Sequence, residues 1–495
     1  MSDYDKFVAL NVKIADISNS MSVLNWDQEV NLPKNGLEKR AKQISTLAGI
    51  SHELLLSKEY ETLVKKLQSQ TLTSIEKANV KEAAKVLTKN KKLTTDYIRE
   101  LAETQTLANN AWLEARNKSD FSIFEPFLEK ILNLKFKECD LIGYDKHPYD
   151  VMLDTYEPGL TTERVEIIFK DAKSPLLELL GKINKKEVPN NSFMLRQYNK
   201  AQQWDFGIYL LKQMGYDFDS GRQDLSAHPF TTSLGPNDVR ITTRINEQNL
   251  YEMIWSCIHE GGHALYEQGL PADQYGLAAG EYASLGIHES QSRIWENNVG
   301  RSLSYWKANF KVLKDSFPDR LANVTLVDFY KAINIVKPSL IRTASDELTY
   351  HFHVMIRFEI EKALFEKSIK IKDLPSVWND KYKSILDVNV PNDAQGVLQD
   401  IHWSHGSFGY FPTYSIGSFY AAQFYNKAQK DIPNLEGYIE KGDMKPLLKW
   451  LRKNIHQYGR VYNAEELCEK VTGSTLNSKY FMDYANQKYG GLYEL

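Results

Sequence analysis

Apolar residues recur every three or four positions over most of the chain. Residues 37–67 show the pattern well, because charged residues separate Ile44, Leu47, Ile50 and Leu54. Side chains at this spacing lie on one face of an α-helix. The same period is found in residues 74–94, 124–144 and 346–367. The pattern therefore predicts a protein built mainly from α-helices.

One short segment has a different period. Residues 238–245, "DVRITTRI", alternate in the manner of a β-strand and follow the turn sequence "LGPND". The chain contains no internal repeat, no low-complexity tract and no linker rich in Pro, Gly or Ser. We therefore expect one domain over residues 1–495, mainly α with a small β-sheet.

Composition narrows the class of protein. The 495 residues include 61 basic and 64 acidic side chains, so no strong field attracts nucleic acid or an anionic membrane. Three widely spaced cysteines cannot form a disulfide framework, which favours a reducing compartment. The chain begins with acidic residues instead of a secretory signal, and no uncharged apolar stretch is long enough to cross a bilayer. We expect a soluble cytoplasmic protein with no nucleic-acid or membrane partner.

Candidate chemistry enters with "SCIHEGGHALYEQGLP", residues 256–271. The segment has helical spacing, yet Gly261 and Gly262 lie in its middle. Each glycine costs a helix interior about 1 kcal/mol relative to Ala. A helix that keeps two glycines at this cost is expected to need the space, because another backbone or a substrate lies close against it.

The residues beside these glycines suggest a metal site. His259 and His263 are four positions apart, so both imidazoles leave the same face of the helix one turn apart. Two such nitrogens can reach one zinc ion at about 2.0–2.1 Å. Glu260, one step round the helix, can face the water on the metal. The alternative is a pair of surface histidines beside a salt-bridging glutamate, which would not explain the two glycines.

A catalytic zinc site needs a third protein ligand and an open position. Glu267 lies on the same face as His263, but it is eight residues from His259, which is about 12 Å along the helix axis. That distance is too long for one ion. Position 269, where a metzincin carries its third histidine, is a glycine. The third ligand must come from elsewhere in the chain.

A second predicted helix, residues 280–298, offers three glutamates, Glu281, Glu289 and Glu296. Spacing favours Glu289 over the other two as the ligand that completes the site. Its neighbour His288 points about 100° away. We therefore expect His288 to contact a ligand or the substrate instead of the metal.

Six motifs occur in the order found in a known family. They are "HPF", "DVRIT", "HEGGH", "HESQ", "IRTASD" and "GVLQDIHW", which begin at residues 228, 238, 259, 288, 341 and 396. The chain resembles the thermostable (Taq-type) metallocarboxypeptidase family. "LNWDQEVNLP" near the N-terminus and "KYGGLYEL" at the C-terminus extend the resemblance over nearly the whole chain. Ser345 stands where many members carry Ala.

The resemblance implies a site and a fold. His259, His263 and Glu289 would bind one zinc ion per chain, with cobalt as an alternative metal, and Glu260 would be the general acid and base. The fold would be a large two-lobed helical body with a deep active-site groove. Roughly residues 1–200 would form an N-terminal lid and lobe, and residues 201–495 the catalytic part. Members are typically homodimers that remove C-terminal residues from peptides.

Other motif residues are candidates for binding the substrate. Tyr410, Tyr414 and His228 could donate hydrogen bonds to the oxyanion, by analogy with other helical metallopeptidases. Gln399 and His402 could donate hydrogen bonds near the cleft, with Asp400 and Trp403 bracing them; these four share the motif "GVLQDIHW".

An exopeptidase must also hold the free carboxylate of its substrate, which Arg does through a bidentate pair. Arg342 and Arg240 are the two motif arginines, and we favour Arg342. Either could instead form a structural salt bridge, Arg342 with Asp346 or Arg240 with Asp238.

The sequence thus predicts a zinc-dependent carboxypeptidase that acts on peptides. An endo-acting oligopeptidase of the same helical class is one alternative. A helical protein whose metal site is only structural is the other. The chain has no GxSxG, P-loop or GxGxxG motif to support a different chemistry.

Overall fold

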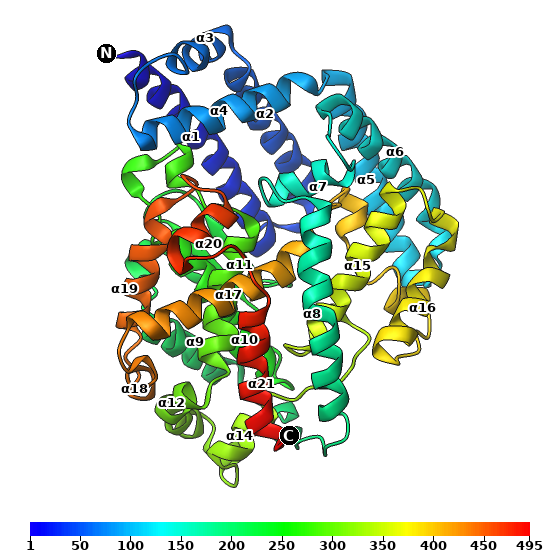
Figure 1. The fold of residues 1–495 in the computed structure, drawn as a ribbon, viewed down its shortest axis with the longest axis vertical. Coiled ribbons are helices and arrows are strands. Elements are labelled where there is room, and N and C mark those ends of the chain that lie inside the picture. Colours follow the sequence, from blue (N-terminus) through cyan, green and yellow to red (C-terminus); the bar gives the residue numbers. More distant parts are fainter. The chain divides into compact units, whose positions relative to one another are not determined.

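The computed structural model describes residues 1–495 and is mainly α-helical, as predicted (Figure 1). It also contains one small sheet, as predicted. The chain forms two compact units. Unit 1 comprises Met1–Asn90, Pro189–Ile333 and Tyr420–Leu476; unit 2 comprises Lys91–Val188, Asn334–Phe419 and Asn477–Leu495. Each unit therefore draws on both sides of residue 200. The expected division of roles between residues 1–200 and 201–495 stays a prediction.

Unit 1 contains the sheet and the larger share of the helices. The helices are α1 (Asp3–Val30), α2 (Leu37–Leu55), α3 (Lys58–Leu67), α4 (Ser74–Lys92, which ends at the boundary), α9 (Lys200–Met214), α10 (Leu250–Glu267), α11 (Leu285–Arg293), a π-helix (Ile294–Gly300), α12 (Leu303–Ser316), α13 (Pro318–Leu321), α14 (Leu326–Ala332), α18 (Leu435–Glu440), α19 (Lys445–Asn454) and α20 (Ala464–Thr472). Short 3-10 turns connect several of them.

Unit 2 contains helices and connecting segments but no β-strand. Its helices are α5 (Thr95–Lys118), α6 (Glu125–Ile142), α7 (Tyr149–Tyr156), α8 (Thr162–Ile183), α15 (Thr349–Phe365), α16 (Leu374–Leu386) and α21 (Lys479–Tyr493). Helix α17 (Phe411–Asp431) begins in unit 2 and ends in unit 1.

The sheet has three strands in the order β1-β3-β2, with bounds β1 Gln223–Leu225, β2 Thr231–Ser233 and β3 Val239–Thr243. β1 runs parallel to β3, and β2 runs antiparallel to it. The central strand β3 falls within the segment predicted from alternation. Two of its alternate side chains, Val239 and Ile241, are buried, and the strand packs against α10.

The helix predicted for residues 37–67 is divided into α2 and α3. The hydroxyl oxygen of Ser57 accepts the backbone N–H of Tyr60 at 3.2 Å, and this cap starts α3. α2 packs against α1 but buries none of its residues fully, and Ile50 is 43% exposed. The period therefore predicted the helices correctly, but not the depth at which α2 is buried.

Helix α10 lies among β3, α9, α11 and the π-helix. Its apolar residues Ile254, Ile258 and Leu265 are buried, as their spacing predicts. The side-chain oxygen of Asn249 accepts the N–H of Tyr251 and caps the first turn. The buried apolar face of α10 thus positions the face that carries His259 and His263.

The two glycines of α10 allow two different close approaches. A Cβ at Gly262 would lie 2.6 Å from the Cα of Ser292 and 2.9 Å from the carbonyl oxygen of Gln291, both backbone atoms of α11. A Cβ at Gly261 would lie 2.7 Å from a methyl group of Leu211 on α9. The expected approach of another backbone is therefore found at Gly262.

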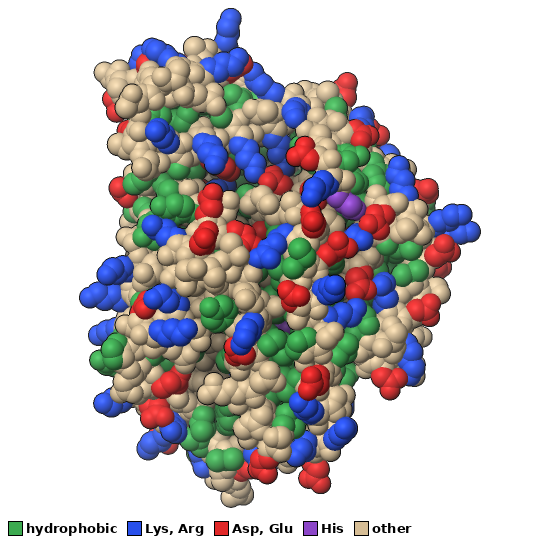
Figure 2. All heavy atoms as spheres, in the orientation of Figure 1, with side chains coloured by type: hydrophobic (Ala, Val, Ile, Leu, Met, Phe, Trp, Pro, Cys, Tyr) green, Lys and Arg blue, Asp and Glu red, His purple; other side chains and the backbone are tan.

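The surface carries both signs of charge. Figure 2 shows basic and acidic side chains interspersed over the face in view, in keeping with the total of 61 basic and 64 acidic residues. None of the helices combines the length and the apolar character that a membrane crossing requires.

Candidate metal centre

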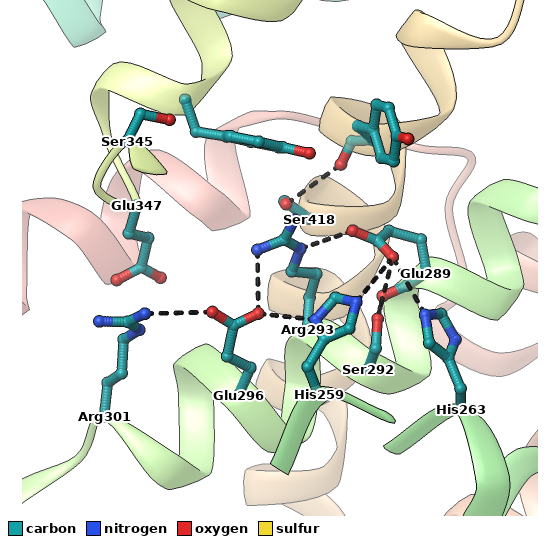
Figure 3. A network of polar contacts seen from close by, with 12 residues as sticks. His259, His263, Glu289, Ser292, Arg293, Glu296, Arg301, Ser345, Glu347 and Ser418 are labelled. Atoms are coloured by element: carbon teal, nitrogen blue, oxygen red, sulfur yellow. Dashed lines mark hydrogen bonds and ion pairs between the residues drawn. The ribbon is translucent and has the colours of Figure 1, made fainter. Parts of the chain in front are cut away.

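Two elements of unit 1 bring three potential metal ligands together. Helix α10 carries His259 and His263, and α11 carries Glu289. One ligand atom from each residue lies within 4.8 Å of the other two. Glu289 Oε2 is 3.7 Å from His259 Nε2 and 3.4 Å from His263 Nε2 (Figure 3). Two nitrogens and one oxygen so placed fit a divalent transition metal such as zinc.

Neighbours on its own helix hold Glu289 in this position. Its Oε1 accepts a hydrogen bond from Arg293 Nε at 2.6 Å, and the Ser292 hydroxyl lies 3.0 Å from its Oε2. Burial alone would raise the pKa of this carboxyl. The positive charges of Arg293 and His259 outweigh that effect and hold the pKa well below its usual range. Glu289 is therefore ionised, as a metal ligand must be.

Glu296 belongs to the π-helix and occupies a different place from Glu289. Its Oε2 lies 2.8 Å from His259 Nδ1, on the side of the imidazole that faces away from Glu289. Arg293 and Arg301 donate to its two oxygens at 2.9 and 3.1 Å. A carboxylate here orients the ring and leaves Nε2 free for a metal. Glu281, the third glutamate considered, is outside the convergent group.

His263 is supported by a longer chain of contacts. Its Nδ1 lies 2.6 Å from His288 Nδ1, and His288 Nε2 lies 2.8 Å from Glu267 Oε1. His288 thus contacts a candidate ligand, the placement expected from its position in the sequence. Burial, together with the neighbouring His288, lowers the pKa of His263 to about 3. His263 is therefore neutral, and its lone pair is available.

Glu260 is the candidate general base. Its side chain is buried, and the hydroxyl of Thr231 on β2 lies 2.7 Å from its Oε2 and 2.9 Å from its backbone oxygen. Burial raises the pKa of the Glu260 carboxyl, although His259 and the Thr231 hydroxyl act in the opposite direction. A raised pKa suits a carboxylate that must accept a proton and later release it.

The other predicted residues of unit 1, His228 and Arg240, are exposed and half-buried, respectively. The imidazole of His228 is exposed, and its backbone oxygen accepts a hydrogen bond from the Ser226 hydroxyl. Arg240 makes two hydrogen bonds of 2.8 Å to Asp238, the partner considered as its structural alternative. Its guanidinium also lies 4.3 Å from the centre of the Trp26 ring. Substrate contacts by His228 and Arg240 stay predictions.

Unit 2 gathers a second polar cluster around Asp400. Arg342 donates to Asp400 Oδ1 through Nε and Nη2 at 3.0 and 2.9 Å. Asp346, the partner considered in the alternative of a structural salt bridge, does not pair with Arg342, because its side chain accepts the backbone N–H groups of Leu348 and Thr349 at the start of α15. Arg357 also binds Asp400, through Nε at 2.7 Å. The cluster therefore holds two guanidinium groups around one carboxylate.

The remaining candidates join this cluster. Gln399 accepts hydrogen bonds from Arg357 and from the backbone N–H of Arg342, at 2.8 and 3.1 Å. His402 Nε2 lies 3.2 Å from the hydroxyl of Tyr414, and the ring of Tyr410 is 5.1 Å from the His402 ring. Gln399, Asp400, His402, Tyr410, Tyr414 and Arg342 thus belong to unit 2, whereas the three candidate ligands belong to unit 1.

Several residues of these clusters were missed in the sequence. Arg293 follows Glu289 by four positions, a spacing that suggests an ion pair on a helix. Arg357 follows the apolar run Val354–Ile356 and precedes Phe358, and a cation among apolar residues is a sign of a buried partner. No local pattern points to Thr231, because its contact with Glu260 depends on the pairing of β2 with β3.

Comparison with known proteins gives matches over nearly the whole chain. A sequence profile of the family described as "Carboxypeptidase Taq (M32) metallopeptidase" matches residues 6–489. "Carboxypeptidase 1" of Bacillus subtilis (strain 168) is 38% identical over 496 residues, 99% of each chain. "Thermostable carboxypeptidase 1" of Pyrococcus furiosus is 41% identical over 485 residues, 96% of each. The chain in the crystal structure of M32 carboxypeptidase from Deinococcus radiodurans R1 has 37% sequence identity to this one. The two structures superpose over 100% of both chains with a TM-score of 0.98.

Proposed function

The chain belongs to the carboxypeptidase Taq (M32) metallopeptidase family and is a metal-dependent carboxypeptidase, and on that premise we propose that His259, His263 and Glu289 bind one zinc ion per chain. The observation that carries the proposal is the convergence of their three ligand atoms within 4.8 Å. Two imidazoles and a carboxylate are a zinc set with room left for water. Cobalt, which accepts the same ligands, is the alternative ion.

When bound by these three residues, zinc would supply the nucleophile, because it lowers the pKa of water from 15.7 to about 7. Glu260 accepts a proton from the attacking water and delivers it to the nitrogen of the departing residue. Its buried, raised-pKa carboxyl supports both steps, and Thr231 keeps one of its oxygens in a fixed direction.

Binding of the substrate carboxylate is assigned to Arg342. Its cluster carries two guanidinium groups and a single acidic partner, so a net positive charge remains for an anionic group. Gln399, His402, Tyr410 and Tyr414 are proposed as further substrate contacts from the same cluster. We assign Arg240 and His228 the same role in unit 1, and Asp400 the role of bracing the cluster.

A homodimer is the proposed assembly, on the basis of the family resemblance. The proposed location is the cytoplasm, on the basis of the three widely spaced cysteines, and peptides are the proposed substrates. Size-exclusion chromatography with light scattering measures the first of these directly.

Matched peptides test the direction of attack. Two peptides of one sequence, with a free or an amidated C-terminus, are incubated with protein of known metal content and analysed by mass spectrometry. We expect single residues to be released from the peptide with the free C-terminus and not from the amidated peptide. We expect the protein to contain one zinc ion per chain. Internal fragments that also arise from the amidated peptide would show an endo-acting oligopeptidase instead.

Substitution of Glu260 tests the catalytic assignment. Glu260→Gln keeps the size of the side chain but cannot accept the proton. We expect zinc content to stay at one ion per chain and kcat to fall by about 10²–10⁴-fold. Unchanged activity in the zinc-loaded variant would refute the mechanism. Zinc binding without cleavage of any peptide by the unaltered protein would show a purely structural metal site.

A further inference from the structure

The two histidines of the candidate metal centre are held in different ways at their Nδ1 atoms. His259 Nδ1 lies 2.8 Å from the carboxylate of Glu296. His263 Nδ1 lies 2.6 Å from another imidazole, that of His288, and only the far nitrogen of His288 reaches a carboxylate, that of Glu267 at 2.8 Å. The carboxylate that supports His263, that of Glu267, is therefore two hydrogen bonds away from this candidate ligand.

The donors and acceptors of these two hydrogen bonds can be assigned by starting from the carboxylate of Glu267. A carboxylate oxygen accepts hydrogen bonds, so the contact of 2.8 Å between His288 Nε2 and Glu267 Oε1 is assigned as an N–H of His288 that donates to Glu267. The contact of 2.6 Å between the two Nδ1 atoms needs one donor and one acceptor, and with its N–H on Nε2 the imidazole of His288 offers Nδ1 as the acceptor for the N–H of His263 Nδ1. His263 in this tautomer has its own lone pair on Nε2, the nitrogen that faces Glu289.

The ring of His288 is fixed by its surroundings. The ring of Tyr282 meets it at 5.1 Å and that of Tyr266 at 5.4 Å, both edge to face. Tyr266 is itself held, because its hydroxyl oxygen accepts the backbone N–H of Ala283 at 3.1 Å. His288 thus has little freedom to turn away, and its proton arrangement is set by its polar partners.

We propose that Glu267 is a positioning residue for the metal, which acts through His288 to fix the tautomer of His263. Glu267 is too far along α10 from His259 to bind the same ion. Its position one helical turn after His263 places it where it can orient the imidazole that contacts that ligand. This inference rests on the proposed role of His263 as a ligand.

The affinity for zinc is the measurement, by competition between the holoenzyme and a chromophoric chelator. Glu267→Gln keeps the side-chain shape, but its amide can donate to His288 and so allow the opposite tautomer. Glu267→Asp keeps the charge, but it is one methylene shorter and cannot span the distance. We expect both variants to lose zinc affinity by about 10–100-fold, the usual effect of removing a partner of a ligand.

Two comparisons separate this role from other effects. Glu281→Gln removes a neighbouring carboxylate that has no contact with His288, and it should change the zinc affinity by less than about twofold. In a His288→Gln background, Glu267→Gln should cause no further loss, because the two residues act in series. The visible spectrum of the cobalt-substituted protein should change in Glu267→Gln and not in Glu281→Gln.

The possible results are distinct. Unchanged zinc affinity in Glu267→Gln, with unaltered protein that binds zinc and cleaves peptides, would overturn the inference and leave the proposed function intact. Retained affinity in Glu267→Asp alone would show that charge, and not the hydrogen bond to His288, is what matters. Unaltered protein that binds no zinc would instead refute the proposed function.

Discussion

Single charged side chains determine what the candidate metal centre can hold. Glu260, Glu289 and Glu296 are all less than 10% exposed, and two cations, Arg293 and Arg301, pair with the last two. When His259 is neutral, as a metal ligand must be, three carboxylates and two guanidinium groups leave an excess of negative charge in a buried place, where an unpaired charge is costly. A divalent cation offsets this excess. Without it, Glu260 is the carboxyl whose raised pKa lets it take up a proton.

The first prediction concerns the contact between Thr231 and Glu260. Thr231→Val keeps the branched shape and removes the hydroxyl that lies 2.7 Å from Glu260 Oε2. We expect kcat to fall about tenfold, a change of about 1.4 kcal/mol in the barrier, with zinc content unchanged. Steady-state kinetics and metal analysis test this. Thr232→Val is the control, because adjacent side chains of a strand point to opposite faces; an equal loss of kcat in that variant would contradict a specific role for Thr231.

A second prediction concerns a buried carboxyl of unit 2. Glu361 accepts hydrogen bonds from Tyr149, Trp403 and the backbone N–H of Gly409, and burial raises its pKa from 4.5 to about 7. The folded protein then binds more protons than the unfolded chain between these pH values. Its free energy of unfolding should therefore fall as pH rises from 4.5 to 7, by roughly 3 kcal/mol from this group.

Glu361→Gln cannot titrate, so it isolates this contribution. Urea unfolding of both proteins across pH 4 to 8 should show the unaltered protein losing stability relative to the variant as pH rises. Parallel profiles for the two proteins would rule out a titrating Glu361.

Local spacing was sufficient to predict some of these residues and not others. His259 and His263 are one helical turn apart, so their shared face follows from helix geometry alone. Helix geometry does not predict the partner of Arg342, because Asp400 is 58 positions away and is brought to it by the fold. Local sequence instead suggested Asp346, which has its own task of starting α15.

At the level of helices, the metal centre depends on how closely α10 and α11 approach. Gly262 meets the backbone of α11 at Ser292, three positions after Glu289. The pair of glycines in a helix predicted a close neighbour, but the sequence could not show which element it was. The π-helix that places Glu296 was not predicted either, because a single wide turn leaves no period to detect.

Substitutions of glycine by alanine test this approach. Gly262→Ala should lower the free energy of unfolding by about 1–3 kcal/mol and weaken zinc binding, because the added methyl group meets backbone that cannot move aside. Gly261→Ala should have a smaller effect, since its neighbours are flexible side chains of α9. Urea unfolding and zinc competition give both values.

Gly181→Ala on α8 is the matched control. An added Cβ there has no atom within 4 Å, so the substitution should raise stability by up to about 1 kcal/mol. If Gly262→Ala also stabilised the protein and kept its zinc affinity, the close packing of α10 on α11 would not be required.

At the level of the whole molecule, the two units have unequal shares in the metal centre. All three candidate ligands come from unit 1, within residues 259–289, while the guanidinium cluster around Asp400 belongs to unit 2. The chain passes between the units several times, so sequence order does not reveal this division. Helical periods predict which segments are helices, but membership of a unit depends on contacts between distant segments.

Removal of the metal should therefore affect the units to different extents. A ligand that binds only the folded state stabilises it, by about 4.1 kcal/mol at a concentration 1,000 times its Kd. Because the ligands lie on α10 and α11, chelation should lower the melting temperature and increase amide exchange mainly in these helices and in the π-helix that carries Glu296. Helices α8 and α15 of unit 2 contribute no ligand and should keep their protection.

Hydrogen exchange followed by mass spectrometry, with and without chelator, resolves these segments. The Glu289→Gln variant is a useful comparison, because it should show increased exchange in α10 and α11 before any chelator is added and little further change afterwards. Equal loss of protection in α8 and α15 would mean that the metal stabilises both units as one cooperative structure. Unchanged exchange in α10 and α11 on chelation would place the metal elsewhere in the chain.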